Sequence, residues 1–304
     1  MKPRAKRDPD SRPRGSESPR VYHIKLMRSV RPPDFFFDAR ELVERGRGMA
    51  DRFAAAAPFA HAVIDDFLPP DVLAGLIAEF PQEDSGCWTK RHFDTTTQTR
   101  KLACSDEAAF GPLTRHVVSQ LLSHAFLRFL EALSGDSGLI TDPSHNACGL
   151  QSTGAGGKLA VHTDLDRHPV AGLTQRLNVL LYLNPDWREE YGGHLELWDR
   201  ELTGARQRIL PVANRLVVFR AGPHSYHGHP QPLTCPADRR RNSIALYYYG
   251  LGTQGSRADD VAWVATQPDE KQVAARRALR RWAHYFLPPA FVDFVRWVRG
   301  RTRG

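Results

Sequence analysis

The 304-residue chain lacks features that mark several large protein classes. No apolar run approaches the roughly 18–20 residues that a membrane-spanning helix needs. The N-terminal residues are charged and no apolar stretch follows them, so we expect no secretory signal. With 41% hydrophobic and 25% charged residues, the composition predicts a globular, cytoplasmic protein with room for one large domain or two small ones.

Cysteine is scarce. The four cysteines, Cys87, Cys104, Cys148 and Cys235, form no CxxC pair. A structural zinc site or a disulfide framework needs paired or clustered thiols. We therefore expect four reduced thiols and neither kind of cross-link.

Net positive charge is missing from the body of the chain, although the whole chain carries +8. Residues 1–20 hold seven Lys/Arg against three Asp/Glu, and residues 271–304 hold nine against one. Residues 21–270 therefore carry a net −4. A basic groove for nucleic acid in the body is disfavoured, and we expect no nucleic-acid partner.

Composition and periodicity divide the chain into four segments. Residues 1–20, rich in Pro, Arg and Ser, predict a disordered basic N-terminus. Residues 21–145 predict a helical support region with one leading strand, and 146–254 a core of short strands. Residues 255–304 predict basic amphipathic helices. Helices followed by many short strands predict an α+β fold: a double-stranded β-helix (jelly-roll) core backed by N-terminal helices.

Individual elements follow from caps and spacing. Asp38 is expected to cap a helix over 38–57, and Asp71 a second helix after the leading strand at 61–68. Residues 106–134 form the strongest helical stretch. Core strands are expected at 147–152, 158–164, 176–183, 194–198, 215–220, 224–229 and 242–249.

The last 34 residues carry two apolar stripes flanked by arginines. The first stripe, Ala275, Leu279, Trp282 and Phe286, is too apolar to leave in water, so we expect it to pack on the protein. Residues 290–304 are the better candidate for a peripheral contact with an anionic membrane or a partner. The oligomeric state is not predicted.

The strongest chemical signal is the step His162-Thr163-Asp164 at the end of an apolar run. In an extended strand, residues i and i+2 point to the same side, so the imidazole and the carboxylate project together. A second imidazole, His227, follows 63 residues after Asp164. Two imidazoles and one carboxylate leave coordination positions open and suit non-haem Fe(II). We therefore predict His162, Asp164 and His227 as metal ligands and catalytic residues.

The surrounding blocks resemble one known family. These blocks are Arg176–Trp187, Tyr191–Trp198, Arg215–Phe219, Ser225–Pro230 and Arg241–Tyr249. Their order and gaps resemble the prolyl-hydroxylase-like branch of the Fe(II)/2-oxoglutarate-dependent dioxygenases. The resemblance is strong over about 145–250, loose over about 60–145, and absent elsewhere.

This resemblance implies Fe(II), 2-oxoglutarate and O₂, with ascorbate as an optional reductant. It implies hydroxylation of an unactivated C–H bond of a prolyl, amino-acid, peptide or natural-product substrate, with release of succinate and CO₂. Related halogenases carry a small residue in place of Asp164, so hydroxylation is favoured over halogenation. The family positions of the residues that bind the distal carboxylate of 2-oxoglutarate match Arg241 and Tyr182. A guanidinium suits that role because it offers a carboxylate two parallel donors.

Several alternatives stay open at the site. Arg239 and Arg240 adjoin Arg241, and Arg239 would share its strand face. His224 and His229 compete with His227 for the third ligand, and His229 would otherwise lie beside the ligands or on the substrate side. His194 is expected on the surface. Four residues could line the substrate mouth or be structural: Trp88, Trp198, Asp166 and Arg167.

Two other functions remain. A jelly roll can be a non-catalytic binding module, which loss of a ligand residue would have favoured, and none is missing. The basic termini could anchor nucleic acid, as in a nucleobase demethylase. The acidic body and the absence of a basic aromatic groove count against that function.

Overall fold

The computed structural model describes residues 35–88, 96–142, 148–164, 167–168, 171–252, 262–267 and 270–271. The expectations for residues 1–20 and for the two C-terminal stripes concern segments outside these described residues. No helix among the described residues is long and apolar enough to cross a bilayer.

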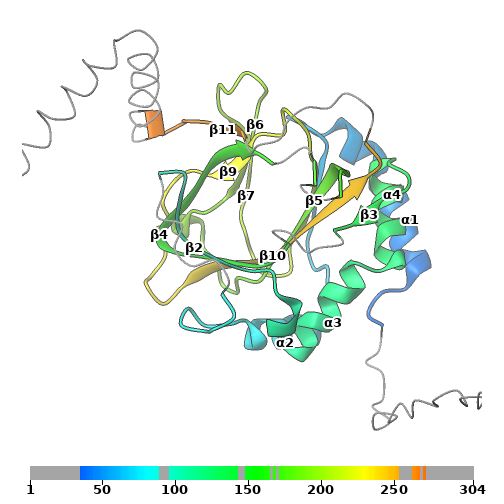
Figure 1. The fold of residues 1–304 in the computed structure, drawn as a ribbon, viewed down its shortest axis with the longest axis horizontal. Coiled ribbons are helices and arrows are strands. Elements are labelled where there is room, and N and C mark those ends of the chain that lie inside the picture. The colour runs from blue at the N-terminus through cyan, green and yellow to red at the C-terminus, as the bar shows by residue number, and fades with distance from the viewer. Residues whose placement is uncertain are drawn as a thin grey trace, which may run out of the picture. The chain divides into compact units, whose positions relative to one another are not determined.

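The described strands form one curled antiparallel sheet (Figure 1). Its main path runs β1-β8-β5-β10-β4-β9-β6-β7, and β2 and β11 also pair with β4 while β3 pairs with β10. The bounds are β1 His61–Ile64, β2 Gln98–Cys104, β3 Ile140–Thr141, β4 Gly149–Thr163, β5 Thr174–Tyr182, β6 Leu195–Trp198, β7 Ala205–Ile209, β8 Leu216–Arg220, β9 His227–His229, β10 Arg240–Gly250 and β11 Ala262–Trp263. The jelly-roll core expected from the sequence is confirmed.

Helices cover one side of this sheet, where Figure 1 shows α1 and α4 beside β3 and α2 and α3 next to each other below them. The bounds are α1 Ala39–Ala55, α2 Pro70–Glu79, α3 Pro112–Leu121 and α4 His124–Ser134, with short 3₁₀ turns η1 Glu107–Ala109 and η2 Glu189–Tyr191. The Tyr248 hydroxyl of β10 donates to the Leu121 carbonyl, 2.6 Å away, and its ring lies 6.0 Å from that of Phe126. These buried contacts fix β10, the strand that carries Arg241, against the helices.

The helix starts confirm one cap and correct another. Asp38 accepts from the backbone N–H groups of Arg40 and Glu41 at 2.8 and 3.0 Å, as expected of an N-cap. Asp71 is not a cap, because α2 already begins at Pro70. Proline suits the first helical position since it has no N–H to leave unpaired there.

The stretch at 106–134 is two helices and a 3₁₀ turn. Helix α3 ends at Leu121, and Ser123 is the N-cap of the next helix, α4. The Ser123 hydroxyl accepts from the Phe126 backbone N–H at 3.5 Å and begins α4.

Strand β4 organises the core. The runs expected at 147–152 and 158–164 are one 15-residue strand. Gly156, whose backbone is left-handed (φ +75°), lies between the two expected runs and keeps the strand continuous. Its first half pairs with β10, where Thr153 lies opposite Arg241. Its second half pairs with β9, where His162 lies opposite His227. One strand therefore spans both groups of predicted site residues.

Four of the described strands lie outside the expected runs: β2, β3, β7 and β11. β2 belongs to the segment expected to be helical, yet it pairs with β4 along most of its length. β11 comes after the predicted end of the core and pairs with the end of β4 that carries His162.

Candidate active site

The end of β4 and the start of β9 bring three predicted residues together. The donor atoms of His162, Asp164 and His227 all lie within 4.8 Å of one another. Atoms that each bind one ion at about 2.0–2.2 Å lie within roughly 4 Å of one another, so the observed spread is slightly wider. His162 Nε2 is 3.6 Å from Asp164 Oδ1, and His227 Nε2 is 3.7 Å from Asp164 Oδ2. The two imidazole centroids are 4.5 Å apart.

Both histidines are oriented by backbone carbonyls. Nδ1 of His162 lies 2.9 Å from the Ala160 oxygen, and Nδ1 of His227 lies 2.9 Å from the Ser225 oxygen. A carbonyl oxygen only accepts, so each Nδ1 carries the proton and donates it. In a neutral ring this leaves the Nε2 lone pair directed at Asp164, the tautomer that a metal ligand requires.

Asp164 is held as a carboxylate. Its Oδ2 accepts from the Asn178 amide and, at 3.4 Å, from the Gln175 amide. Burial acts to raise the pKa of Asp164, but His227, His162 and the Asn178 hydrogen bond together lower it well below its usual range. Burial lowers the pKa of His227 to about 4 against the opposing charge of Asp164, so this imidazole is neutral at pH 7. The cluster thus offers Nε2 of two imidazoles and one negatively charged carboxylate oxygen.

Arg241 and Tyr182 form a second buried group. Arg241 Nη2 donates to the Tyr182 hydroxyl at 3.0 Å, and its Cζ lies 4.9 Å from the centre of the tyrosine ring. Burial raises the pKa of Tyr182, so its hydroxyl keeps its proton. The hydroxyl accepts from Arg241 and can donate that proton elsewhere, while the guanidinium retains further N–H donors. Together they can bind one carboxylate through several charge-assisted hydrogen bonds.

The neighbouring arginines face other partners. Arg239 Nη1 donates to the Pro185 carbonyl at 3.1 Å. Arg240 pairs with Glu83 at 2.9 Å and donates to the Ser152 hydroxyl at 2.8 Å. Of the three arginines, Arg241 is the buried one.

Gly193 makes the placement of Arg241 possible. Its carbonyl accepts from Arg241 Nε at 2.7 Å. Its backbone is left-handed (φ +71°), and a Cβ there would lie 2.5 Å from a Leu233 methyl carbon and 3.1 Å from Arg241 Cδ. Only glycine lets the backbone approach this closely. No local pattern in the sequence indicates this contact between Gly193 and Arg241.

The remaining histidines stay out of the metal cluster. His224 is exposed, and its ring lies 6.4 Å from that of Tyr226. His194, expected on the surface, is buried, and its Nε2 lies 2.9 Å from Glu189 Oε1. His229 is buried on β9, two residues beyond His227, and does not join the three converging donor groups.

One tryptophan takes the structural alternative that the sequence left open, and another was not anticipated. Trp88 is a core residue packed against Phe80, with its Nε1 donating to the Gln82 carbonyl at 2.8 Å. Trp263 was not anticipated, yet its ring stacks on that of His162 at 4.9 Å and remains 38% exposed. The end of β11 thus supplies an aromatic side chain at the metal cluster.

The other three residues considered for the substrate mouth give no support for that role. Asp166 lies outside the described residues, Arg167 forms an isolated β-bridge with Thr174, and Trp198 Nε1 donates to Glu196 Oε2 at 3.0 Å.

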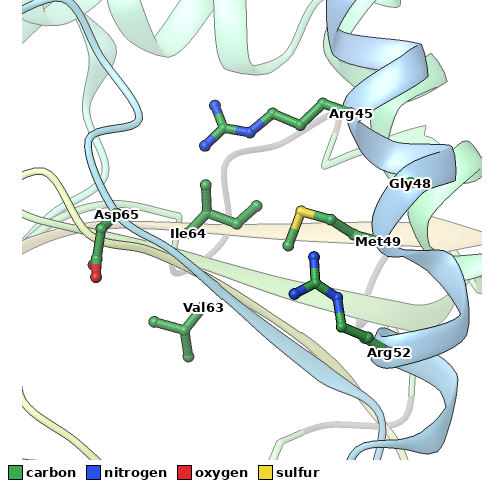
Figure 2. Close-up of a pocket in the computed structure, with 7 residues that line it drawn as sticks. All are labelled: Arg45, Gly48, Met49, Arg52, Val63, Ile64 and Asp65. Atoms are coloured by element: carbon green, nitrogen blue, oxygen red, sulfur yellow. The ribbon is translucent and has the colours of Figure 1, made fainter.

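A separate hollow of about 450 Å³ lies between α1 and β1 (Figure 2). Figure 2 shows Arg45, Met49 and Arg52 reaching from α1 toward Val63 and Ile64. Its one carboxylate, Asp65, already pairs with Arg215 at 2.6 and 2.9 Å. The hollow shares no residue with the buried clusters and offers no set of metal-binding or acid–base groups.

Comparison with known proteins finds a family match for the strand-rich core. Residues 148–249 match the model of the 2OG-Fe(II) oxygenase superfamily. A prolyl hydroxylase from Trichoplax adhaerens, in complex with a hypoxia inducible factor oxygen degradation domain peptide fragment, is similar with a TM-score of 0.53 at 18% identity, covering 69% of this chain and 91% of its own. A prolyl-4-hydroxylase from Pseudomonas putida has a TM-score of 0.50 at 22% identity, with coverages of 67% and 98%. No curated protein sequence matches the chain. The structural similarities establish the double-stranded β-helix fold.

Proposed function

We propose, from the membership of residues 148–249 in the 2OG-Fe(II) oxygenase superfamily, that this protein is an Fe(II)- and 2-oxoglutarate-dependent dioxygenase that hydroxylates a C–H bond. The observation that carries the proposal is the convergence of two imidazoles and one carboxylate inside the jelly roll. Near it, the buried Arg241 lies on β10, another pairing partner of β4, and contacts the buried Tyr182 of β5. When bound, the iron with 2-oxoglutarate and O₂ supplies the oxidising chemistry and yields succinate and CO₂.

The metal ligands in this proposal are His162, Asp164 and His227. Their chemistry fits Fe(II), which takes imidazole nitrogen and carboxylate oxygen and keeps positions open in this ligand set. The Ala160 and Ser225 carbonyls orient the two rings, so little reorganisation is needed on binding.

Arg241 and Tyr182 bind the distal carboxylate of 2-oxoglutarate in this proposal. The closely packed Gly193 carbonyl holds the guanidinium at one edge, and the other N–H groups remain for the anion. Burial excludes competing water and strengthens each charge-assisted bond.

The substrate is proposed to be a prolyl or other amino-acid residue, a peptide, or a natural-product intermediate. The half-exposed Trp263 ring beside His162 suits contact with an apolar or ring-containing group next to the reacting C–H bond. A non-catalytic binding module would not need ligand groups tuned to a neutral imidazole and a carboxylate, so the enzymatic function is favoured.

The test combines metal binding with succinate release. Purified protein should bind one Fe(II) per chain and form succinate from 2-oxoglutarate in the presence of a substrate drawn from proline-containing peptides, free amino acids and lipid-linked compounds. His227→Ala should lose both properties. His224→Ala is the matched control, because this exposed ring lies three residues away and outside the cluster. Metal binding without succinate from any substrate would instead support a binding module.

Cytoplasmic location remains a proposal supported by the few, unpaired cysteines. A peripheral contact of residues 290–304 with anionic membranes is also a proposal, supported by the charge distribution and the apolar stripe of the tail. Truncation after Pro289 should leave succinate formation intact and lower salt-sensitive binding to anionic vesicles. If full-length protein ignores such vesicles at low salt, the membrane contact is rejected.

A further inference from the structure

His229 carries a buried polar atom without a partner. The residue is 3% exposed, and no described residue lies within hydrogen-bonding distance of its Nδ1. A buried nitrogen without a hydrogen bond is destabilising, so native proteins rarely leave one unless a ligand or water completes it. The other two buried histidines on this face, His162 and His227, each use Nδ1 in a backbone hydrogen bond.

The position of His229 lies between the two groups of the site. Along β4, His227 pairs opposite His162, His229 opposite Leu159, and Arg241 opposite Thr153. Alternation along β9 also gives His229 the same strand face as His227. The unpartnered ring thus stands between the metal cluster and Arg241 in the order of the strand.

The electrostatic surroundings of His229 point toward Arg241. Burial is the largest influence lowering the pKa of His229, followed by the positive charges of Arg241 and Lys101 and then by His162. A dicarboxylate beside Arg241 would meet this ring in a positive region.

We propose that His229 is a further binding residue for 2-oxoglutarate, with its Nδ1–H donating to the distal carboxylate that Arg241 and Tyr182 also hold. This inference rests on the proposed function and adds a residue to it. A neutral imidazole carries one N–H, and the Nδ1–H tautomer places that donor on the nitrogen that lacks a partner. A carboxylate oxygen satisfies it with a charge-assisted hydrogen bond.

The experiment measures affinity rather than activity. Isothermal titration without O₂, with Mn(II) in place of Fe(II), gives the dissociation constants of 2-oxoglutarate and of 2-oxobutyrate, which lacks the distal carboxylate. His229→Phe removes the donor and keeps a ring, so 2-oxoglutarate should bind about 10- to 100-fold more weakly, as expected for loss of a hydrogen bond to a charged group. Binding of 2-oxobutyrate and of Mn(II) should change less than about threefold, within the scatter of unrelated substitutions.

A second pair of variants keeps the test decisive if the phenylalanine variant does not fold. His229→Asn keeps an amide donor near the place of Nδ1, whereas His229→Gln moves it toward the place of Nε2. The asparagine variant should bind 2-oxoglutarate more tightly than the glutamine variant. Equal affinities, or equal losses for 2-oxoglutarate and 2-oxobutyrate in any variant, would overturn the role of His229. A wild-type protein that binds Mn(II) but no 2-oxoglutarate would instead reject the proposed co-substrate, and His229's role with it.

Discussion

The site has two ends, the metal cluster of His162, Asp164 and His227 and the region around Arg241. The buried histidines of these two ends differ in their hydrogen bonds. At the metal end, His162 and His227 each donate from Nδ1 to a backbone carbonyl at 2.9 Å. At the Arg241 end, His229 is just as buried, yet its Nδ1 has no partner among the described residues. The metal end is thus oriented by the chain itself, whereas His229 retains a nitrogen that a ligand or water would have to satisfy. Substitutions at the two ends should therefore separate metal binding from co-substrate binding.

The largest effect is expected at Asp164, the one charged ligand. Asp164→Ala leaves only two imidazoles and no carboxylate, so Fe(II) affinity should fall by more than about a hundredfold, beyond the 10- to 100-fold typical of outer partners. Succinate formation should disappear unless chloride takes the open position. Metal titration checks this, with Asp186→Ala on a turn as the control. Unchanged affinity in Asp164→Ala would remove this carboxylate from the ligand set.

The second-largest effect on binding is expected at Arg241. Arg241→Lys replaces a two-pronged donor with a point charge, so 2-oxoglutarate should bind roughly 10- to 100-fold more weakly. Mn(II) affinity should stay the same, because this end does not orient the metal ligands. Arg239→Lys, at the neighbouring position that faces Pro185, should change neither constant. A loss of Mn(II) affinity in Arg241→Lys would erase the proposed separation of the two ends.

Gly193 connects backbone geometry to the Arg241 end. Gly193→Ala introduces a Cβ in a left-handed conformation and within 3.1 Å of Arg241 Cδ. We expect a loss of about 1–3 kcal/mol in the free energy of unfolding, since strained backbone positions carry such costs. The shifted guanidinium should also weaken 2-oxoglutarate binding about tenfold. Gly204→Ala is the control, because nothing lies within 4 Å of its added Cβ. Thermal unfolding and titration that give the same values for both variants would contradict this account.

The smallest effect is expected at Asn178, which acts on the metal through Asp164. Asn178→Ala removes the amide donor to Asp164 Oδ2 and should weaken metal binding by about tenfold, the lower range for outer partners. Affinity for 2-oxoglutarate, measured at saturating Mn(II), should not change. If Asn178→Ala weakens 2-oxoglutarate binding more than metal binding, the two ends are coupled through β5.

The sequence predicted those site residues whose chemistry depends on strand alternation and spacing. His162 and Asp164 share a strand face by the two-residue rule, and the gap to His227 resembles the family pattern. The family resemblance favoured Arg241 over Arg239, and the structure buries Arg241. The contact with Tyr182 was likewise expected and is present.

What the sequence did not predict depends on tertiary approach. Asn178 stands as a polar residue between the buried Leu177 and Val179, a signal that an inward hydrogen bond is needed but not of its partner. Gly193 and Trp263 contact site residues from distant segments, and no local pattern encodes that pairing. The glycines of β4 resembled a loop because glycine normally weakens a strand, and only pairing with neighbouring strands overrides this preference.

The central claim is that His162, Asp164 and His227 bind one metal while Arg241 binds the far end of 2-oxoglutarate. Crystals grown with Mn(II) and 2-oxoglutarate without O₂ would test it directly through anomalous diffraction. The account predicts one strong peak bounded by Nε2 of both histidines and the Asp164 carboxylate, with the distal carboxylate against Arg241. A peak elsewhere, for example between His194 and Glu189, or a distal carboxylate away from Arg241, would contradict it.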